Sequence, residues 1–191
     1  VGIQDMSAFA KCEISGPGAE SWLDQLLTNA VPKKVGRVTL SYLLTNKGGV
    51  RSEFTVYKVA PQRYYLVSAG AYERHDHDYL KKALPRDGSV SFERLTTAMG
   101  VLVLAGPRSR DVLAKLTDAD LSNEAFPWLT GKKISIGLAQ VDALRVNFIG
   151  ELGWEIHHPI EMQNYIFDRL MEAGAEFEIK PFGIRAMTSM A

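Results

Sequence analysis

Two carboxylates stand out because each follows a glycine-containing turn and belongs to a stretch that alternates as a β-strand does. Glu155 follows Gly150 and Gly153, which favour a turn between two predicted strands, Ala143–Phe148 and Trp154–His157. Strand side chains alternate between faces, so we expect Glu155 on the opposite face from its two neighbours. A carboxylate beside aromatic rings can accept charge-assisted hydrogen bonds from the N–H edge of a flat heterocycle. The alternative is an exposed hairpin with solvated charges.

Glu53 follows the turn Asn46–Gly49 on the predicted strand Val50–Val59. It shares one strand face with Thr55 and Tyr57, so it could lie in a polar cleft. In such a cleft a single carboxylate can move a proton or stabilise a cation. A solvent-facing strand residue is the simpler interpretation of the spacing alone.

Other motifs carry less chemistry. The Gly16–Gly18 and Gly106–Arg108 turns precede helices but match no phosphate-binding pattern, and their prolines remove a donor, so we interpret them as structural turns. The run His75–Asp78 suggests metal ligands, yet residues two apart on a helix point in different directions, which favours a polar helix face. No serine, histidine or cysteine lies in a nucleophile motif.

Composition excludes several classes of protein. The 191 residues are 46% hydrophobic and 23% charged, as in an ordinary globular chain, and 22 basic residues balance 22 acidic ones. A formal net charge of zero gives no electrostatic reason to expect nucleic acid or a membrane surface as partner. The single cysteine excludes an internal disulfide, and we expect no metal site.

The elements that must position the two carboxylates occur twice. Ile14–Leu26 and Leu104–Leu116 both read strand, Gly-Pro turn and amphipathic helix, with strands following. We therefore expect an α+β fold of two similar units rather than a parallel βαβ sheet. The second unit is expected to continue to a helix over Glu161–Ala173, capped by Gly174.

Four ordered segments together resemble the folate-binding aminomethyltransferase family, which includes the T-protein of the glycine cleavage system. The segments are Val1–Ser7 followed by Lys11, Asn46–Val50 with Glu53, Leu104–Pro107, and Gly150–Glu155. The resemblance implies the family's α+β fold, with two similar antiparallel-sheet-plus-helix lobes and a third lobe missing from this chain. The expected lobes are residues 1–95 and 96–191.

The resemblance also implies roles for individual residues. Glu155 falls at the family's pteridine-binding glutamate, and Glu53 at the second aspartate of a catalytic Asp-Asp pair. Ser52 stands where the family has the first aspartate of that pair. This departure from the family pattern resembles the branch linked to dimethylglycine and sarcosine dehydrogenases. The other expected folate-binding residues are Phe148, Trp128, Tyr65, Val67 and, beside the turn, Arg145.

The implied activity is tetrahydrofolate-dependent one-carbon transfer, in which an iminium or formaldehyde equivalent from N-methylated glycine oxidation is captured as 5,10-methylenetetrahydrofolate. The expected enzyme is the folate-dependent aminomethyltransferase-like domain of an amine dehydrogenase, with FAD in a separate domain. Its expected partners are folate, a small substrate derived from an N-methylated amine, and a flavin domain or lipoyl carrier protein. The expected location is the cytoplasm, or the mitochondrial matrix in a eukaryote. The alternatives are a T-protein proper and a non-catalytic, folate-binding regulatory relative.

Overall fold

The computed structural model describes residues 1–191, which form two compact units. One unit is Ala8–Thr96, and the other joins Val1–Ser7 to Thr97–Ala191. The first strand of the chain thus belongs to the same unit as the C-terminal half. The lobes expected from the family resemblance, residues 1–95 and 96–191, are a different division of the chain and stay a prediction. None of the helices is both long enough and apolar enough to span a membrane.

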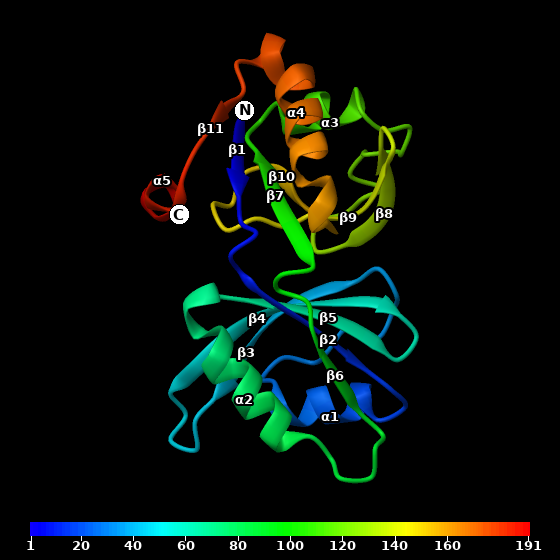
Figure 1. Cartoon of the computed structure of the whole chain (residues 1–191), viewed down its shortest axis with the longest axis vertical. Helices are drawn as coiled ribbons and strands as arrows, with labels where there is room; N and C mark the ends of the chain where they lie inside the picture. The colour runs from blue at the N-terminus through cyan, green and yellow to red at the C-terminus, as the bar shows by residue number, and fades with distance from the viewer. The chain divides into compact units, whose positions relative to one another are not determined.

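The unit that contains both termini is built on a six-stranded sheet in the order β11-β1-β7-β10-β9-β8. Its strands are β1 (Gly2–Asp5), β7 (Met99–Ala105), β8 (Gly131–Ile136), β9 (Ala139–Leu144), β10 (Gly153–Pro159) and β11 (Lys180–Pro181). All neighbouring strands run antiparallel except β1 and β11. In Figure 1, β1 (blue) lies beside β7 (green), although the two are far apart in the sequence.

Helices cover one face of this sheet. Figure 1 shows α3 (Ser109–Ala114) and α4 (Gln163–Gly174) on the same side of β7 and β10, while α5 (Ile184–Met190) follows β11. The core beneath α3 and α4 contains Leu104 and Trp154, both with no exposed surface. Apolar side chains at alternate strand positions thus bury one face of the sheet against the helices.

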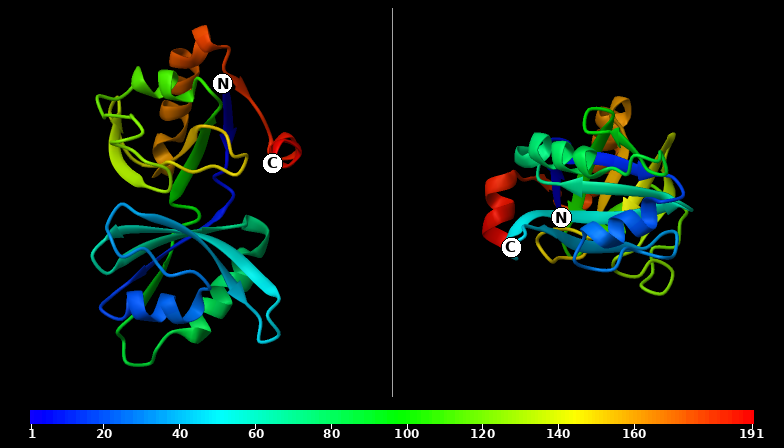
Figure 2. Two further views of the ribbon diagram at one scale, coloured as in Figure 1. Left: turned by 180° about the vertical axis from the view of Figure 1, so that it is seen from behind. Right: turned by 90° about the horizontal axis from the view of Figure 1, so that it is seen from below.

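The second unit is built in the same way on a five-stranded sheet in the order β3-β4-β5-β2-β6. Its strands are β2 (Ala10–Ser15), β3 (Val38–Leu44), β4 (Val50–Ala60), β5 (Arg63–Ser68) and β6 (Ser91–Arg94), all antiparallel. Helices α1 (Ala19–Leu26) and α2 (Glu73–Ala83) pack on one face of this sheet, as Figures 1 and 2 show. The predicted α+β fold with two similar antiparallel units is confirmed.

The repeated Gly-Pro turn has the same backbone conformation in both units. Gly16 has φ of 117° between β2 and α1, and Gly106 has φ of 121° between β7 and α3. Each glycine carbonyl accepts a hydrogen bond from the residue three positions on, Ala19 N at 3.1 Å and Ser109 N at 3.0 Å. A positive φ is available to glycine at little cost, which explains the residue type at both turns.

One expected strand was misplaced. The prediction over Ala143–Phe148 is wrong beyond Leu144, because β9 ends there and a loop leads to β10. The Val146 N–H donates to the Leu144 carbonyl at 2.9 Å, so it makes no hydrogen bond to a neighbouring strand. Gly150 has the expected positive φ of 74°, whereas Gly153 is part of β10.

The predicted glycine cap of the α4 helix is also wrong. The helix includes Gly174, a short 3-10 turn follows, and the left-handed residue is Glu178 with φ of 52°. A Cβ on Gly174 would lie 2.7 Å from the Ile179 side chain. Gly174 is therefore small because another side chain packs on it, not because its φ must be positive.

Candidate functional site

In each unit the sequence-predicted carboxylate lies on the sheet face that carries no helix. Glu155 alternates with Trp154 and Ile156, which both belong to the core under α3 and α4. Glu53 alternates with Phe54, which belongs to the core under α1 and α2. The helices occupy one face of each sheet, so the opposite faces are where ligand-binding side chains can be placed.

Glu155 is a buried carboxylate with an imidazole beside it. Its exposed fraction is 5%, and the next residue on the same face, His157, is 1% exposed. His157 Nε2 lies 3.2 Å from Glu155 Oε2, a distance at which the ring N–H donates to the carboxylate. This hydrogen bond fixes one oxygen of Glu155 and leaves the carboxylate able to accept bonds from another donor. The period-2 alternation already placed His157 on this face, but its role was not predicted from the sequence.

Two predicted aromatic residues lie on adjoining loops at one end of the same sheet. Trp128 is 63% exposed and Phe148 is 59% exposed, which is unusual for rings of this size. Two backbone hydrogen bonds join these loops beyond the ends of β8 and β9, from Leu129 N to Arg145 O at 3.1 Å and from Arg145 N to Thr130 O at 2.8 Å. Exposed aromatic rings offer flat apolar surface to a ligand.

Arg145 points toward the loop before Trp128. Its guanidinium donates to the Phe126 carbonyl at 2.5 Å and to Asn123 Oδ1 at 2.7 Å, and Arg110 donates to the same Asn123 oxygen at 2.6 Å. Burial, and then repulsion from Arg110, lower the pKa of Arg145. The hydrogen bonds of Arg145 to Phe126 and Asn123 therefore hold a loop in place, and its role toward a ligand stays a prediction.

The Ser52–Glu53 pair divides between the two faces of β4. Ser52 is buried, and its hydroxyl donates to the Asp76 carboxylate of α2. Ser68 of β5 donates to the other Asp76 oxygen at 3.1 Å. Glu53 is exposed on the opposite face, where its strand neighbour is Tyr42 of β3. Of the two side chains, only that of Glu53 is exposed.

Tyr65 and Val67 lie on the same helix-free face of the second unit, at 6% and 5% exposure. Val67 pairs with Thr55 on one side and with Lys11 on the other. Lys11 has no exposed surface, and its ammonium donates to the Phe9 carbonyl at 2.9 Å. Lys11 belongs to one of the sequence motifs, but spacing along the chain does not indicate that a lysine is buried.

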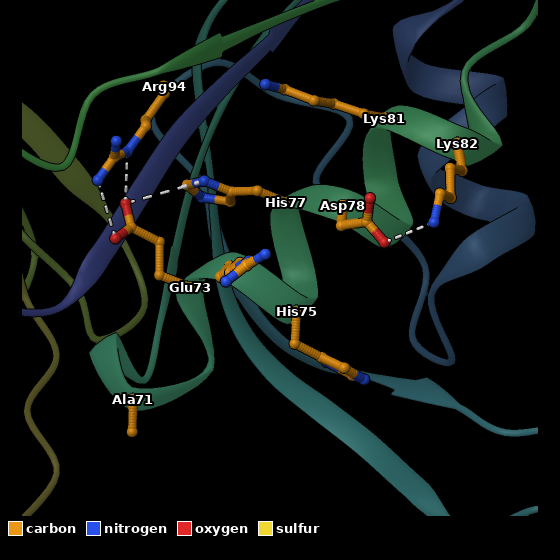
Figure 3. Close-up of a pocket in the computed structure, with 9 residues that line it drawn as sticks. Ala71, Glu73, His75, His77, Asp78, Lys81, Lys82 and Arg94 are labelled. Atoms are coloured by element: carbon orange, nitrogen blue, oxygen red, sulfur yellow. Dashed lines mark hydrogen bonds and ion pairs between the residues drawn. The ribbon is translucent and has the colours of Figure 1, made fainter.

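A surface hollow on α2 is a competing location, and Figure 3 shows its charged lining. Glu73 pairs with Arg94, which lowers the pKa of Glu73, and Asp78 pairs with Lys82. Because these charges largely satisfy one another and no predicted site residue lines the hollow, we do not assign it a ligand.

The same helix corrects a prediction about the His75–Asp78 run. Asp76 has no exposed surface, and His77 is 7% exposed with its pKa lowered by burial. Asp76 and His77 are therefore buried in the protein and do not lie on an exposed polar helix face.

Comparison with known proteins gives matches over the whole chain. The family described as "GCVT N-terminal domain" matches residues 1–191. Mitochondrial dimethylglycine dehydrogenase of Mus musculus is 39% identical over 191 residues, which are 100% of this chain and 22% of that protein. Mitochondrial sarcosine dehydrogenase of Homo sapiens is 32% identical over 202 residues, covering 98% of this chain and 22% of that protein. The chain thus spans about a fifth of the length of these relatives.

Among solved structures, glycine cleavage system aminomethyltransferase T from Bartonella henselae has the same fold. The match has a TM-score of 0.83 at 24% identity and covers 99% of this chain and 49% of that one. The two-unit arrangement of sheets and helices described above is therefore found in that protein as well.

Proposed function

Because the chain belongs to the GCVT N-terminal domain family, we propose that it is the folate-binding part of a dimethylglycine- or sarcosine-dehydrogenase-like flavoprotein. Its reaction is tetrahydrofolate-dependent one-carbon transfer. An iminium or formaldehyde equivalent from the oxidation of an N-methylated glycine is captured as 5,10-methylenetetrahydrofolate. The chemistry that bound tetrahydrofolate supplies is a nitrogen nucleophile for this carbon.

The observation that carries the proposal is the buried carboxylate of Glu155 on the helix-free face of its sheet. A carboxylate fixed on one oxygen by His157 can accept bonds from adjacent N–H groups of a pteridine. The N–H groups of a pteridine donate hydrogen bonds, and a carboxylate only accepts them, so the two groups are complementary. The residue types present therefore fit the folate that the family resemblance implies.

The remaining predicted residues would serve binding and orientation. Trp128 and Phe148 offer exposed rings against which a flat ligand can stack, and Tyr65 and Val67 are buried apolar side chains of a strand that would line the pocket. Arg145 would contribute positive charge near the loop of Trp128. Holding two reacting groups in the correct orientation can supply most of the rate enhancement in such a reaction.

Glu53 is the proposed catalytic carboxylate. It is exposed on the face of β4 that carries no helix, where a negative charge can stabilise a developing cation or accept a proton. Ser52 cannot share this role, because its hydroxyl is buried against Asp76.

The proposed setting follows the relatives named above. FAD would be bound by a separate domain of the longer protein, and the one-carbon donor would be a small substrate derived from an N-methylated amine. The mitochondrial names of these relatives support the mitochondrial matrix as the location in a eukaryote, with the cytoplasm expected otherwise.

The binding role is tested by the substitution Glu155→Gln in the full-length protein. The amide keeps the size of the side chain but removes the charge and replaces one acceptor by a donor. We expect tetrahydrofolate binding to weaken by about 1.5–3 kcal/mol, the range for hydrogen bonds to a charged group. Titration calorimetry measures this, with Glu151→Gln in the preceding exposed loop as a control. Equal affinities for wild type and Glu155→Gln would exclude Glu155 from the site.

Two alternatives differ in their chemistry. A T-protein would accept an aminomethyl group from a lipoyl carrier protein and release ammonia, whereas the proposed enzyme requires no lipoyl donor. A non-catalytic relative would bind folate and leave every one-carbon donor unchanged. Assays of the full-length protein with aminomethyl-lipoate and with an N-methylated glycine, each with tetrahydrofolate, separate the three outcomes.

A further inference from the structure

Gln4 presents a buried hydrogen-bond acceptor without a partner. The residue is 4% exposed on β1, and its side-chain oxygen Oε1 is fully buried and accepts no hydrogen bond. The large majority of buried side-chain polar atoms in proteins have a partner, because an unpaired one lowers stability. An orphaned acceptor therefore needs a reason to be retained.

Strand register places Gln4 in line with the proposed ligand residue. Gln4 is directly opposite Val103 of β7, and Val103 is directly opposite Glu155 of β10. Directly paired residues point to the same face, and Ile3, Leu104 and Trp154 occupy the other face under the helices. Gln4 and Glu155 thus stand two strands apart on one face, with Val103 between them.

The next row of the same face carries almost no side chains. Gly2, Ala105 and Gly153 are paired across the three strands. The Asn147 amide packs on Gly153, with its nitrogen 2.9 Å from where a Cβ would be, and the Asn147 oxygen is also buried without a partner. Two ring carbons of Phe182 lie 2.8 Å from where a Cβ on Gly2 would be, so this row makes room for the Phe182 ring and the Asn147 amide beside the row of Gln4 and Glu155.

The separation of Gln4 and Glu155 can be compared with a ligand ring. Two inter-strand spacings amount to about 10 Å. Two hydrogen bonds of about 2.9 Å each leave about 4 Å between the ligand atoms that donate to them. Two nitrogen atoms on opposite edges of a fused pair of six-membered rings have a separation of this order.

We propose that Gln4 Oε1 accepts a second N–H of the pteridine, on the side of the ring remote from the edge that Glu155 binds. This inference rests on the proposed function. The donors assigned to Glu155, on the pyrimidine ring, are present in oxidised and reduced folates alike. The other ring has no N–H group in fully oxidised folate, because both of its nitrogen atoms carry lone pairs there, and it gains N–H groups on reduction. Gln4 is thus a specificity residue for the reduced cofactor, since its oxygen repels an acceptor.

The test uses Gln4→Leu in the full-length protein, because leucine has a similar volume and no acceptor. Calorimetry under reducing conditions gives the affinities for tetrahydrofolate and for folic acid, and a thermal melt gives the stability of the unliganded protein. We expect tetrahydrofolate to bind about tenfold more weakly, the effect of one lost hydrogen bond. Folic acid should bind equally well or better. The melting temperature should stay equal or rise, because an unpaired buried group is removed.

The opposite directions of these changes distinguish a ligand contact from a structural role. A structural amide would lower the melting temperature when replaced and leave the ratio of the two affinities unchanged, and that result would overturn the proposal. Gln4→Met, with an unbranched side chain, serves if the leucine variant does not fold. Gln140→Met on the exposed part of β9 is the matched control.

The experiments give different results if only the role of Gln4 is wrong and if the proposed function itself is wrong. If wild type binds tetrahydrofolate, Glu155→Gln weakens it and Gln4→Leu changes neither affinity, only the role of Gln4 is overturned. If wild type binds neither folate, both the proposed function and the role of Gln4 are overturned.

Discussion

Glu53 and Glu155 are both strand carboxylates, yet their surroundings suit different tasks. Glu155 is 5% exposed and hydrogen-bonded to His157, so its position is fixed before a ligand arrives. Glu53 is exposed, and its strand partner Tyr42 is 39% exposed. A preorganised acceptor suits ground-state binding, whereas a charge that acts on the reacting atoms need matter only in the transition state.

The catalytic role of Glu53 is tested by Glu53→Gln in the full-length enzyme. We expect formation of 5,10-methylenetetrahydrofolate to slow by about 10- to 1,000-fold, the range for loss of an acid–base or electrostatic contact. Folate affinity should change little, because the proposed contact strengthens only as charge develops. Amine oxidation at the flavin should continue and release formaldehyde.

Single-turnover measurements that follow flavin reduction and methylenetetrahydrofolate formation separately test whether Glu53→Gln slows only the second step. Glu93→Gln, an exposed carboxylate on β6 of the same unit, is the matched control. Equal product yields from wild type and Glu53→Gln would assign Glu53 to the strand surface.

At the scale of elements, the two Gly-Pro turns share a backbone conformation but differ in their surroundings. A Cβ on Gly16 would lie 2.4 Å from the Ser89 carbonyl oxygen, which is backbone and cannot easily move. A Cβ on Gly106 would have its nearest atom at 3.5 Å, which is an ordinary contact. Only the positive φ restricts the residue type at Gly106, whereas Gly16 is restricted by both φ and space.

Alanine substitution at the two turns should therefore have unequal effects. Gly106→Ala is expected to cost about 1–2 kcal/mol of unfolding free energy, the penalty of a left-handed backbone for a residue with a Cβ. Gly16→Ala should cost more, because the chain must also shift away from Ser89. Urea unfolding of the two variants compares the losses. Equal losses would mean that the Ser89 segment moves freely.

At the scale of the whole molecule, the two units have separate apolar cores. The core of one unit includes Leu104, and the core of the other includes Leu23; no residue belongs to both. Each leucine has no exposed surface. Each of the two clusters is made of residues from a single unit, so a cavity in one cluster removes few contacts from the other.

Hydrogen exchange of Leu23→Ala and Leu104→Ala tests this independence. Each change is expected to cost about 2–5 kcal/mol within its own unit, through lost transfer free energy and the cavity left behind. Exchange should rise over residues 8–96 in Leu23→Ala and over residues 97–191 in Leu104→Ala. Equal rises in both units for either variant would show that the two cores unfold together.

The sequence by itself determined the local features of this protein. The Gly-Pro turns and the alternation that sets Glu155 apart from Trp154 depend on neighbouring residues, and the structure has both of them. Four ordered motifs identified the family, which the match over residues 1–191 confirms. The assignments of Glu53 and Glu155 to a folate site came from that resemblance and remain predictions.

Only the tertiary structure decided which distant residues meet. The pairing of β1 with β7 brings Gln4 into line with Glu155, and the packing of α2 buries Asp76 against Ser52. β9 ends at Leu144 because of a backbone hydrogen bond that alternation could not predict. Register and burial depend on partners remote in the chain, and a shift of one residue would move every side chain to the other face. Local spacing carries no information on which partner a strand will have.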